Sequence, residues 1–212
     1  MTTAPTRRTF LVTTLLALTL LGLGQATASA EPSARAFLEQ RHEQVHAILK
    51  RPASSPTEIQ QRNARLTEAI GNLLDYTELS KRALSDHWAE LSDPQRTDFV
   101  SLLSRLVERN YQKNLESTLD FKVRYTGEVG KDDGVVVQTI AHSKANGRAP
   151  EIAIDYTLVA KEGAWRVWDV TTDGVSLVSN YRTQFNRIIH KDGFDALIER
   201  MRKRLDSGDG AI

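Results

Sequence analysis

The chain has 212 residues, of which 40% are hydrophobic and 26% are charged, so it is long enough for one globular domain with a hydrophobic core. It contains no cysteine, which excludes disulfide bridges, thiol catalysis and cysteine metal sites. Its 28 basic and 27 acidic residues leave a formal charge of +1. A near-neutral chain lacks the positive charge on which nucleic-acid binding depends, so we expect no nucleic-acid partner.

The first thirty residues have the composition of an export signal. Arg7-Arg8 form a positive region, residues 10–23 form an apolar stretch, and Ala28-Ser29-Ala30 is a small-residue cleavage site. The apolar stretch is shorter than the about 20 residues that a membrane-spanning helix requires. We expect residues 1–30 to be removed, by either the general secretory or the twin-arginine route, leaving a periplasmic chain that begins at Glu31.

Helical periodicity dominates the next part of the chain. Pro52 ends a first amphipathic helix, and Ser55-Pro56 opens a second one with a capping serine and a proline at the first helical position. A short segment over residues 79–84 follows. The longest helix opens at Ser92-Asp93-Pro94, and its apolar stripe runs over residues 99–119.

At Phe121 the apolar period changes from helical to two, which is typical of strands with one apolar face. Three turn pairs divide this part of the chain, namely Asp133-Gly134, Asn146-Gly147 and Glu162-Gly163. They separate four predicted strands over residues 121–126, 135–142, 151–159 and 165–170. After Asp173-Gly174 the spacing becomes helical again, and a last helix carries apolar residues from Phe194 to Leu205.

The order of helices, strands and helices predicts an α+β domain: a four-stranded antiparallel meander packed on one face by the N-terminal and C-terminal helices. We expect this single domain to span residues 31–206 and a disordered tail to span residues 207–212. The apolar stripes of the long helix and of the helix after Asp173-Gly174 are wide for so small a sheet. We therefore expect an apolar cavity between these helices and the sheet.

One short motif matches the zinc-protease pattern. In His42-Glu43-Gln44-Val45-His46, two imidazoles one turn apart share a helix face, and the glutamate can activate a metal-bound water. The flanking residues are charged, however, and the next histidine, His87, is too far away to complete a known spacing. We interpret His42 and His46 as surface residues and expect no metal, with a zinc hydrolase as one alternative.

A second alternative is an isomerase-like enzyme of cone-shaped fold. His142, Asp155 and Asp169 lie on predicted strands and could form an acid/base set around a cavity. Asp155 alternates with Ile154 and Tyr156, which places it on the opposite, more polar face. We find no nucleophile elbow and no phosphate-binding glycine loop, so we expect no catalysis.

Two blocks of the sequence resemble the MlaC family, also called the toluene-tolerance family, of periplasmic phospholipid carriers of Gram-negative bacteria. The first block runs from Asp75-Tyr76-Thr77-Glu78 through His87-Trp88 to Phe99. The second runs from Trp165-Arg166-Val167-Trp168 to Phe185. The likeness covers nearly all of residues 31–205, and the helix with His42 and His46 is its least family-like part.

The resemblance implies a domain that encloses lipid acyl chains in a deep apolar cavity. It also implies that the protein shuttles phospholipid between an outer-membrane lipoprotein complex and an inner-membrane ABC transporter, and so maintains outer-membrane lipid asymmetry. We expect it to act as a monomer without a cofactor. A third alternative is a periplasmic interaction module whose pocket is only core. The residues that we expect to contact lipid are Val123, Tyr125, Val137, Ile152, Ile154, Tyr156 and Val167 on strands, and Leu103, Val107, Tyr111, Tyr181 and Phe185 on helices.

Overall fold

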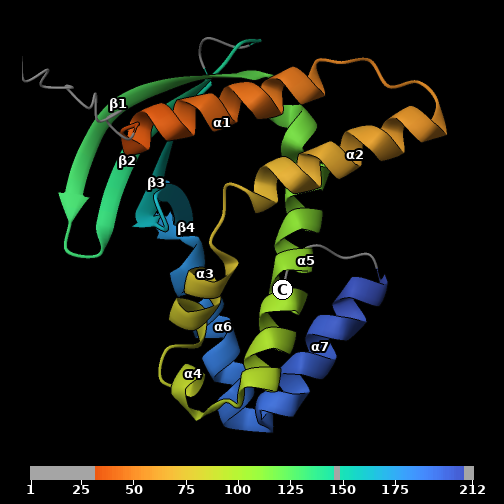
Figure 1. The fold of residues 1–212 in the computed structure, drawn as a ribbon, viewed down its shortest axis with the longest axis vertical. Coiled ribbons are helices and arrows are strands. Elements are labelled where there is room, and N and C mark those ends of the chain that lie inside the picture. The colour runs from red at the N-terminus through yellow and green to blue at the C-terminus, as the bar shows by residue number, and fades with distance from the viewer. Residues whose placement is uncertain (1–31, 146–148, 208–212) are drawn as a thin grey trace, which may run out of the picture. The chain divides into compact units, whose positions relative to one another are not determined.

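The computed structural model describes residues 32–145 and 149–207 (Figure 1). The helices that precede the sheet are α1 (Ala34–Leu49), α2 (Pro56–Gly71), α3 (Tyr76–Leu84), α4 (His87–Glu90) and α5 (Asp93–Thr118). The strands are β1 (Phe121–Lys131), β2 (Gly134–Ser143), β3 (Ile152–Lys161), β4 (Ala164–Thr172) and β5 (Val175–Ser176). The chain continues with α6 (Leu177–Asp192) and α7 (Phe194–Ser207).

The predicted export signal lies outside the described residues, as does the predicted tail beyond Ser207, which is the last residue of α7. Within the described part of the chain, no helix is both long enough and apolar enough to cross a membrane.

The predicted helix starts depend on side-chain caps. At the start of α2, the Ser55 hydroxyl accepts a hydrogen bond from the Glu58 N–H (3.2 Å), and the Glu58 carboxylate accepts one from the Ser55 N–H (2.9 Å). This capping box satisfies two backbone donors that the helix itself leaves unpaired. Ser92 and Gln95 make the same pair of contacts at the start of α5.

The sheet is antiparallel throughout, in the order β1-β2-β3-β4-β5, so the predicted meander is confirmed. Glu162 and Gly163 both have positive φ values (51° and 76°), as a tight hairpin turn requires. Asp173 and Gly174 have the same conformation (47° and 83°), so the chain reverses there and pairs as β5. The prediction of four strands therefore missed a fifth, while the predicted turn at Asn146-Gly147 lies outside the described residues.

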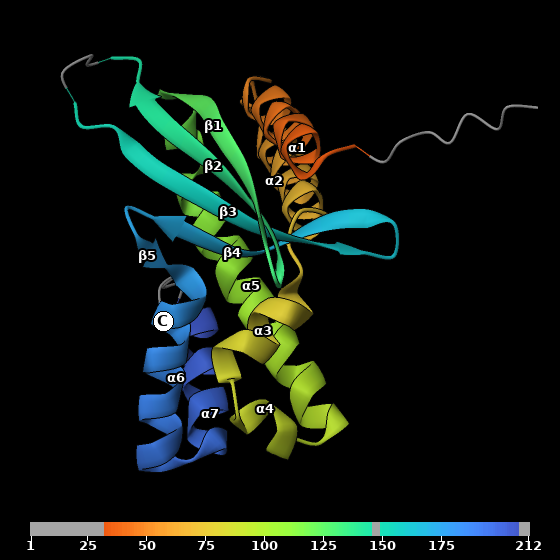
Figure 2. The same cartoon turned by 90° about the vertical axis from the view of Figure 1, so that its left-hand side faces the viewer.

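The helices pack in two groups. Helix α1 lies against β1 and β2, with α2 beside it (Figure 1). Helix α6 packs against α3 and α7, and both of these helices pack against α5, below the sheet in Figure 2. The predicted α+β class is confirmed, and the structure adds that part of α5 and most of α6 pack against other helices and not against the sheet.

The helical group has a fully buried aromatic centre. The rings of Phe99 and Phe185 meet edge to face at 5.5 Å, and Phe185 stacks on Tyr181 at 5.4 Å. Leu103, one turn after Phe99, is also fully buried. These side chains form the core between α5 and α6.

We expect Phe185→Ala to lower the free energy of unfolding by about 3–5 kcal/mol, because the lost phenyl ring leaves a cavity that its neighbours can only partly fill. Urea denaturation checks this. Val175→Ala, at a side chain that is 65% exposed, is the control and should change stability by less than about 0.5 kcal/mol. A loss below about 1 kcal/mol for Phe185→Ala would contradict the packing described.

Candidate functional site

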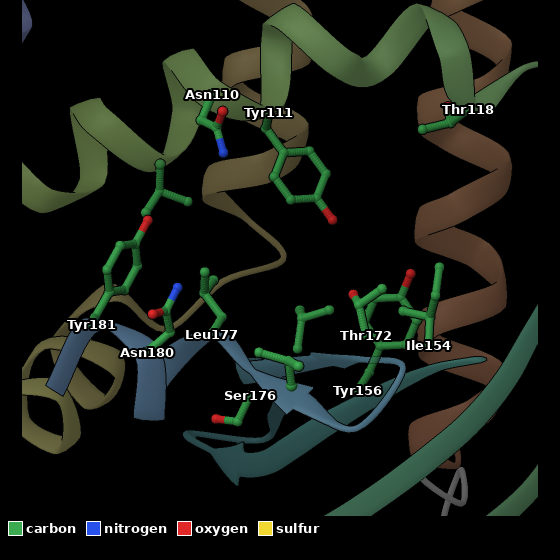
Figure 3. A pocket seen from close by; sticks show the side chains of 13 residues that line it. Asn110, Tyr111, Thr118, Ile154, Tyr156, Thr172, Ser176, Leu177, Asn180 and Tyr181 are labelled. Atoms are coloured by element: carbon green, nitrogen blue, oxygen red, sulfur yellow. The ribbon is translucent and has the colours of Figure 1, made fainter. Parts of the chain in front are cut away.

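A cavity of about 400 Å³ lies between α5, strands β3 to β5 and the first turns of α6 (Figure 3). Helices α5 and α6 thus supply the helical walls of the cavity, and strands β3 to β5 supply the sheet wall. Its lining residues are Val107, Asn110, Tyr111, Thr118, Ile154, Tyr156, Val170, Thr172, Val175, Ser176, Leu177, Asn180 and Tyr181.

The cavity is apolar and uncharged. None of the described residues that line it is an aspartate, glutamate, lysine, arginine or histidine. Burial raises the pKa of Tyr111, Tyr156 and Tyr181 above the usual range, so these phenols stay neutral. The Tyr111 hydroxyl points into the cavity, toward the side where Ile154 and Tyr156 lie (Figure 3). Such a lining suits hydrocarbon and disfavours a charged ligand group.

A buried carboxylate connects the sheet to the helix that walls the cavity. Asp169 on β4 accepts hydrogen bonds from the Ser176 hydroxyl (2.6 Å), the Val178 N–H (3.0 Å) and the Val170 N–H (2.9 Å). The Ser176 hydroxyl in turn accepts a bond from the Ser179 N–H (3.0 Å) and so caps α6. These bonds hold the start of α6 beside the cavity.

Five of the sequence-predicted site residues line this cavity. Val107 and Tyr111 come from α5, Ile154 and Tyr156 from β3, and Tyr181 from α6. Ile154 and Tyr156 share a face because side chains alternate along a strand. The structure therefore brings the two predicted helices and the predicted strand face together around one space.

Other predicted residues lie elsewhere. Leu103 and Phe185 are each one turn further from the sheet than Val107 and Tyr181, and both are fully buried in the helical core. Val137 and Val167 are also fully buried. Ile152 is half-buried and is not among the residues that line the cavity.

The two predicted residues of β1 border hollows next to α1. Val123 lines a small chamber of about 110 Å³ and also an open groove of about 330 Å³, and Tyr125 lines only the groove. The Tyr125 hydroxyl is hydrogen-bonded to Nδ1 of His42 (2.6 Å).

Sequence reasoning missed most of the residues at the β4–β5 turn and the start of α6. Thr172, Val175, Ser176, Leu177 and Asn180 all line the cavity. The Asp173-Gly174 pair was the available signal, because a chain reversal directly before a helix brings the strand end and the first helical turn together. The missed lining residues outside this stretch are Asn110, Thr118 and Val170.

The interpretation of His42 as a surface residue is wrong. Its imidazole faces the sheet, where its ring centroid lies 5.3 Å from that of Tyr156 and 5.9 Å from that of Tyr125. Burial, with a smaller contribution from His46, lowers the pKa of His42 to about 4. Charged flanking residues indicate an exposed helix, but they do not show which side chains a neighbouring strand covers.

The residues of the zinc-protease motif are not arranged as a metal site requires. Glu43 is exposed, while His42 is bonded to Tyr125. Among residues 32–145 and 149–207, no group of three or more histidine, aspartate or glutamate side chains could hold a metal ion.

We expect the stability of the wild type to fall, relative to His42→Gln, as the pH drops from 6.5 to 4. The unfolded chain then binds a proton at His42 that the folded chain excludes, so the stability present above pH 6.5 is lost on the way to the folded pKa of about 4. At about 1.4 kcal/mol per pKa unit, the full loss is roughly 3 kcal/mol. Urea unfolding of both proteins at several pH values measures the difference. Parallel curves would contradict the burial of His42.

The three residues of the alternative acid/base set do not meet around the cavity. Nδ1 of His142 lies 3.2 Å from a carboxylate oxygen of Glu151. The Asp169 carboxylate accepts a hydrogen bond from the Val178 N–H at the start of α6. Asp155 alternates with the cavity residues Ile154 and Tyr156, so it faces away from the cavity. None of the three is among the lining residues.

Comparison with known proteins identifies similar chains. Residues 39–203 match the family described as "MlaC protein". The chain is 25% identical over 183 residues, covering 84% of both chains, to the intermembrane phospholipid transport system binding protein MlaC of Haemophilus influenzae. A solved structure of the phospholipid-binding protein from Ralstonia solanacearum, in complex with a phospholipid, superposes with a TM-score of 0.69. It covers 84% of this chain and 99% of that one at 21% identity, so this likeness concerns the fold.

Proposed function

This chain belongs to the MlaC family, and we propose that it is a phospholipid carrier that holds acyl chains in the cavity between α5, α6 and the sheet. The relative from Haemophilus influenzae is named as the binding protein of an intermembrane phospholipid transport system. The similar structure from Ralstonia solanacearum contains a bound phospholipid. Both names support a lipid as the ligand.

The observation that supports this function most is an apolar cavity whose described lining carries no charge. A phospholipid exposes about 30 methylenes in water, and at about 0.8 kcal/mol each their hydration costs on the order of 20 kcal/mol. A carrier outside the membrane therefore has to enclose the chains almost completely. The cavity offers valine, leucine, isoleucine and tyrosine side chains for that purpose.

We assign the polar head group to the cavity mouth. Asn180 and Thr172, which are both exposed at the edge of the cavity, supply a neutral amide and a neutral hydroxyl group there. Such groups can donate hydrogen bonds to a phosphate but do not distinguish the charges of different head groups. The carrier should therefore accept phospholipids with different heads.

The family also suggests where the carrier works. We propose that the processed protein is periplasmic and acts as a monomer. We further propose that it exchanges phospholipid between an inner-membrane ABC transporter and an outer-membrane lipoprotein complex, which maintains outer-membrane lipid asymmetry. Neither a metal nor a cofactor enters this proposal. An acid/base enzyme is less well supported, because none of His142, Asp155 and Asp169 is among the residues that line the cavity.

We expect the exported protein to begin near Glu31. The first thirty residues have the pattern of a cleaved export signal. N-terminal sequencing of protein purified from a bacterial periplasm measures the start. An intact protein that begins at Met1 and sediments with membranes would contradict export as a processed carrier.

We expect wild-type protein from the periplasm to release phospholipid on organic extraction, and Ile154→Glu to release at least about tenfold less. Ile154 lines the cavity, so its replacement places a carboxylate against the acyl chains, at a cost that is large for an unpaired charge. Because the cavity can admit water once lipid leaves, the variant should stay folded. Mass spectrometry and thermal melting measure the two effects.

Ala153→Glu is the matched control, since Ala153 is the exposed neighbour of Ile154 on the opposite face of β3. It should keep its lipid. A wild type that never contains phospholipid would refute the carrier function. A folded Ile154→Glu with a full lipid load would refute the assignment of the cavity as the site.

A further inference from the structure

The cavity continues beyond its main volume. The small chamber of about 110 Å³ shares Tyr111, Thr118, Ile154 and Tyr156 with the main cavity. Figure 3 shows Thr118, Ile154 and Tyr156 at one side of the main cavity and Asn180 and Tyr181 at the other. A ligand that enters beside α6 can therefore continue past Tyr111 and Tyr156 toward α1.

The chamber has apolar sides and a polar end. Its sides are formed by Val45 of α1, by the end of α2 at Ile70 and by Ala141 of β2, among others. His42 and His46 line it on the side of α1, and they also line the groove that lies outside. The groove carries charged residues, namely Glu39, Glu43, Lys122 and Lys144. The histidines thus separate an apolar interior from a charged, open surface.

We infer that this chamber takes the end of one acyl chain, and that His42, held by Tyr125, limits the length of chain that the carrier accepts. The inference rests on the proposed phospholipid-carrier function and deepens it, since it names chain length as a property that the protein selects. It also gives a role to the histidine motif that the carrier function does not otherwise explain.

The dimensions of the sheet agree with a chain-length limit. The passage runs from Thr172 on β4 to Val123 on β1, across three inter-strand steps of about 4.8 Å, or roughly 14 Å. The hydrocarbon core of a bilayer is about 30 Å thick, so one leaflet holds its chains within about 15 Å. One chain in a membrane-like conformation therefore fits between the mouth and His42.

The contacts of His42 explain why a longer chain is excluded. Its imidazole is bonded to the Tyr125 hydroxyl at 2.6 Å and lies edge-on against the Tyr156 ring. A chain that extended further would have to break this partly buried hydrogen bond and leave polar groups without partners. Its terminal methyl would then enter the charged groove, where burial of hydrocarbon ends.

The experiment compares binding of phosphatidylglycerols with two dodecanoyl or two octadecanoyl chains, delivered from vesicles to lipid-free protein. Val45→Trp fills the chamber from α1. We expect it to lower the affinity for the octadecanoyl lipid about tenfold, the effect of excluding two methylenes, and to change the affinity for the dodecanoyl lipid less than about threefold. Ala141→Leu fills the chamber from the sheet and should act in the same direction.

Ile48→Trp is the matched control, because Ile48 lies on the same helix but borders a different hollow. It should bind both lipids like the wild type. His42→Ala removes the limit and should shift the binding preference toward longer chains. Ala141→Leu decides the result where Val45→Trp does not fold.

The outcomes separate the two proposals. A wild type that binds neither lipid refutes the carrier function. A wild type that binds lipid, together with filled variants that lose both chain lengths equally or lose neither, refutes only the chain-length limit. A second readout is independent of affinity: a diazirine at the end of an octadecanoyl chain should crosslink to the α1 peptide around Val45. Crosslinks only to α6 would overturn the inference.

Discussion

The cavity depends on the buried carboxylate of Asp169. It is only 7% exposed, and its oxygens receive three hydrogen bonds, two of them from the turn and helix that follow β4. A buried charge is tolerated only when such donors surround it, so the carboxylate and the start of α6 stabilise each other. Because β5 and the first turns of α6 supply much of the cavity wall, this one side chain determines where the wall stands relative to the sheet.

The main cavity occupies the junction between two differently packed regions. On one side, α5 and α6 are held by the aromatic contacts of Phe99 and Phe185. On the other side, α1 covers β1 and β2. A helical core that is fully packed can keep the walls apart without help from the ligand, because well-packed interiors resist compression. The stable part of the fold and its open part are thus adjacent along the same helices.

Local chemistry made much of the fold predictable. Caps such as Ser55 with Glu58, and turn pairs such as Glu162-Gly163, depend only on neighbouring residues, and the structure contains both. The strand β5 was not predictable from periodicity, because two residues cannot establish a period. Its only signal was the Asp173-Gly174 pair.

The site was less predictable than the fold, because an apolar stripe shows which face of a helix is buried but not what covers it. Val107 and Leu103 belong to the same stripe of α5, yet one lines the cavity and the other lies in the helical core. The same difference separates Tyr181 from Phe185 on α6. His42 shows the converse case, since a polar residue on a charged helix is covered by Tyr125 from a distant strand.

Both edges of the sheet are protected against pairing with the strands of a second molecule. The free side of β4 is closed by the segment after α2, where the Val167 N–H donates to Leu73 (2.9 Å) and the Asp75 N–H donates to Val167 (2.8 Å). Strand β1, at the other margin, carries exposed charges at Lys122, Arg124 and Glu128. Open strand edges invite pairing with a second chain, and both devices oppose it. A protein with an accessible apolar interior needs this protection against aggregation more than a fully packed one does.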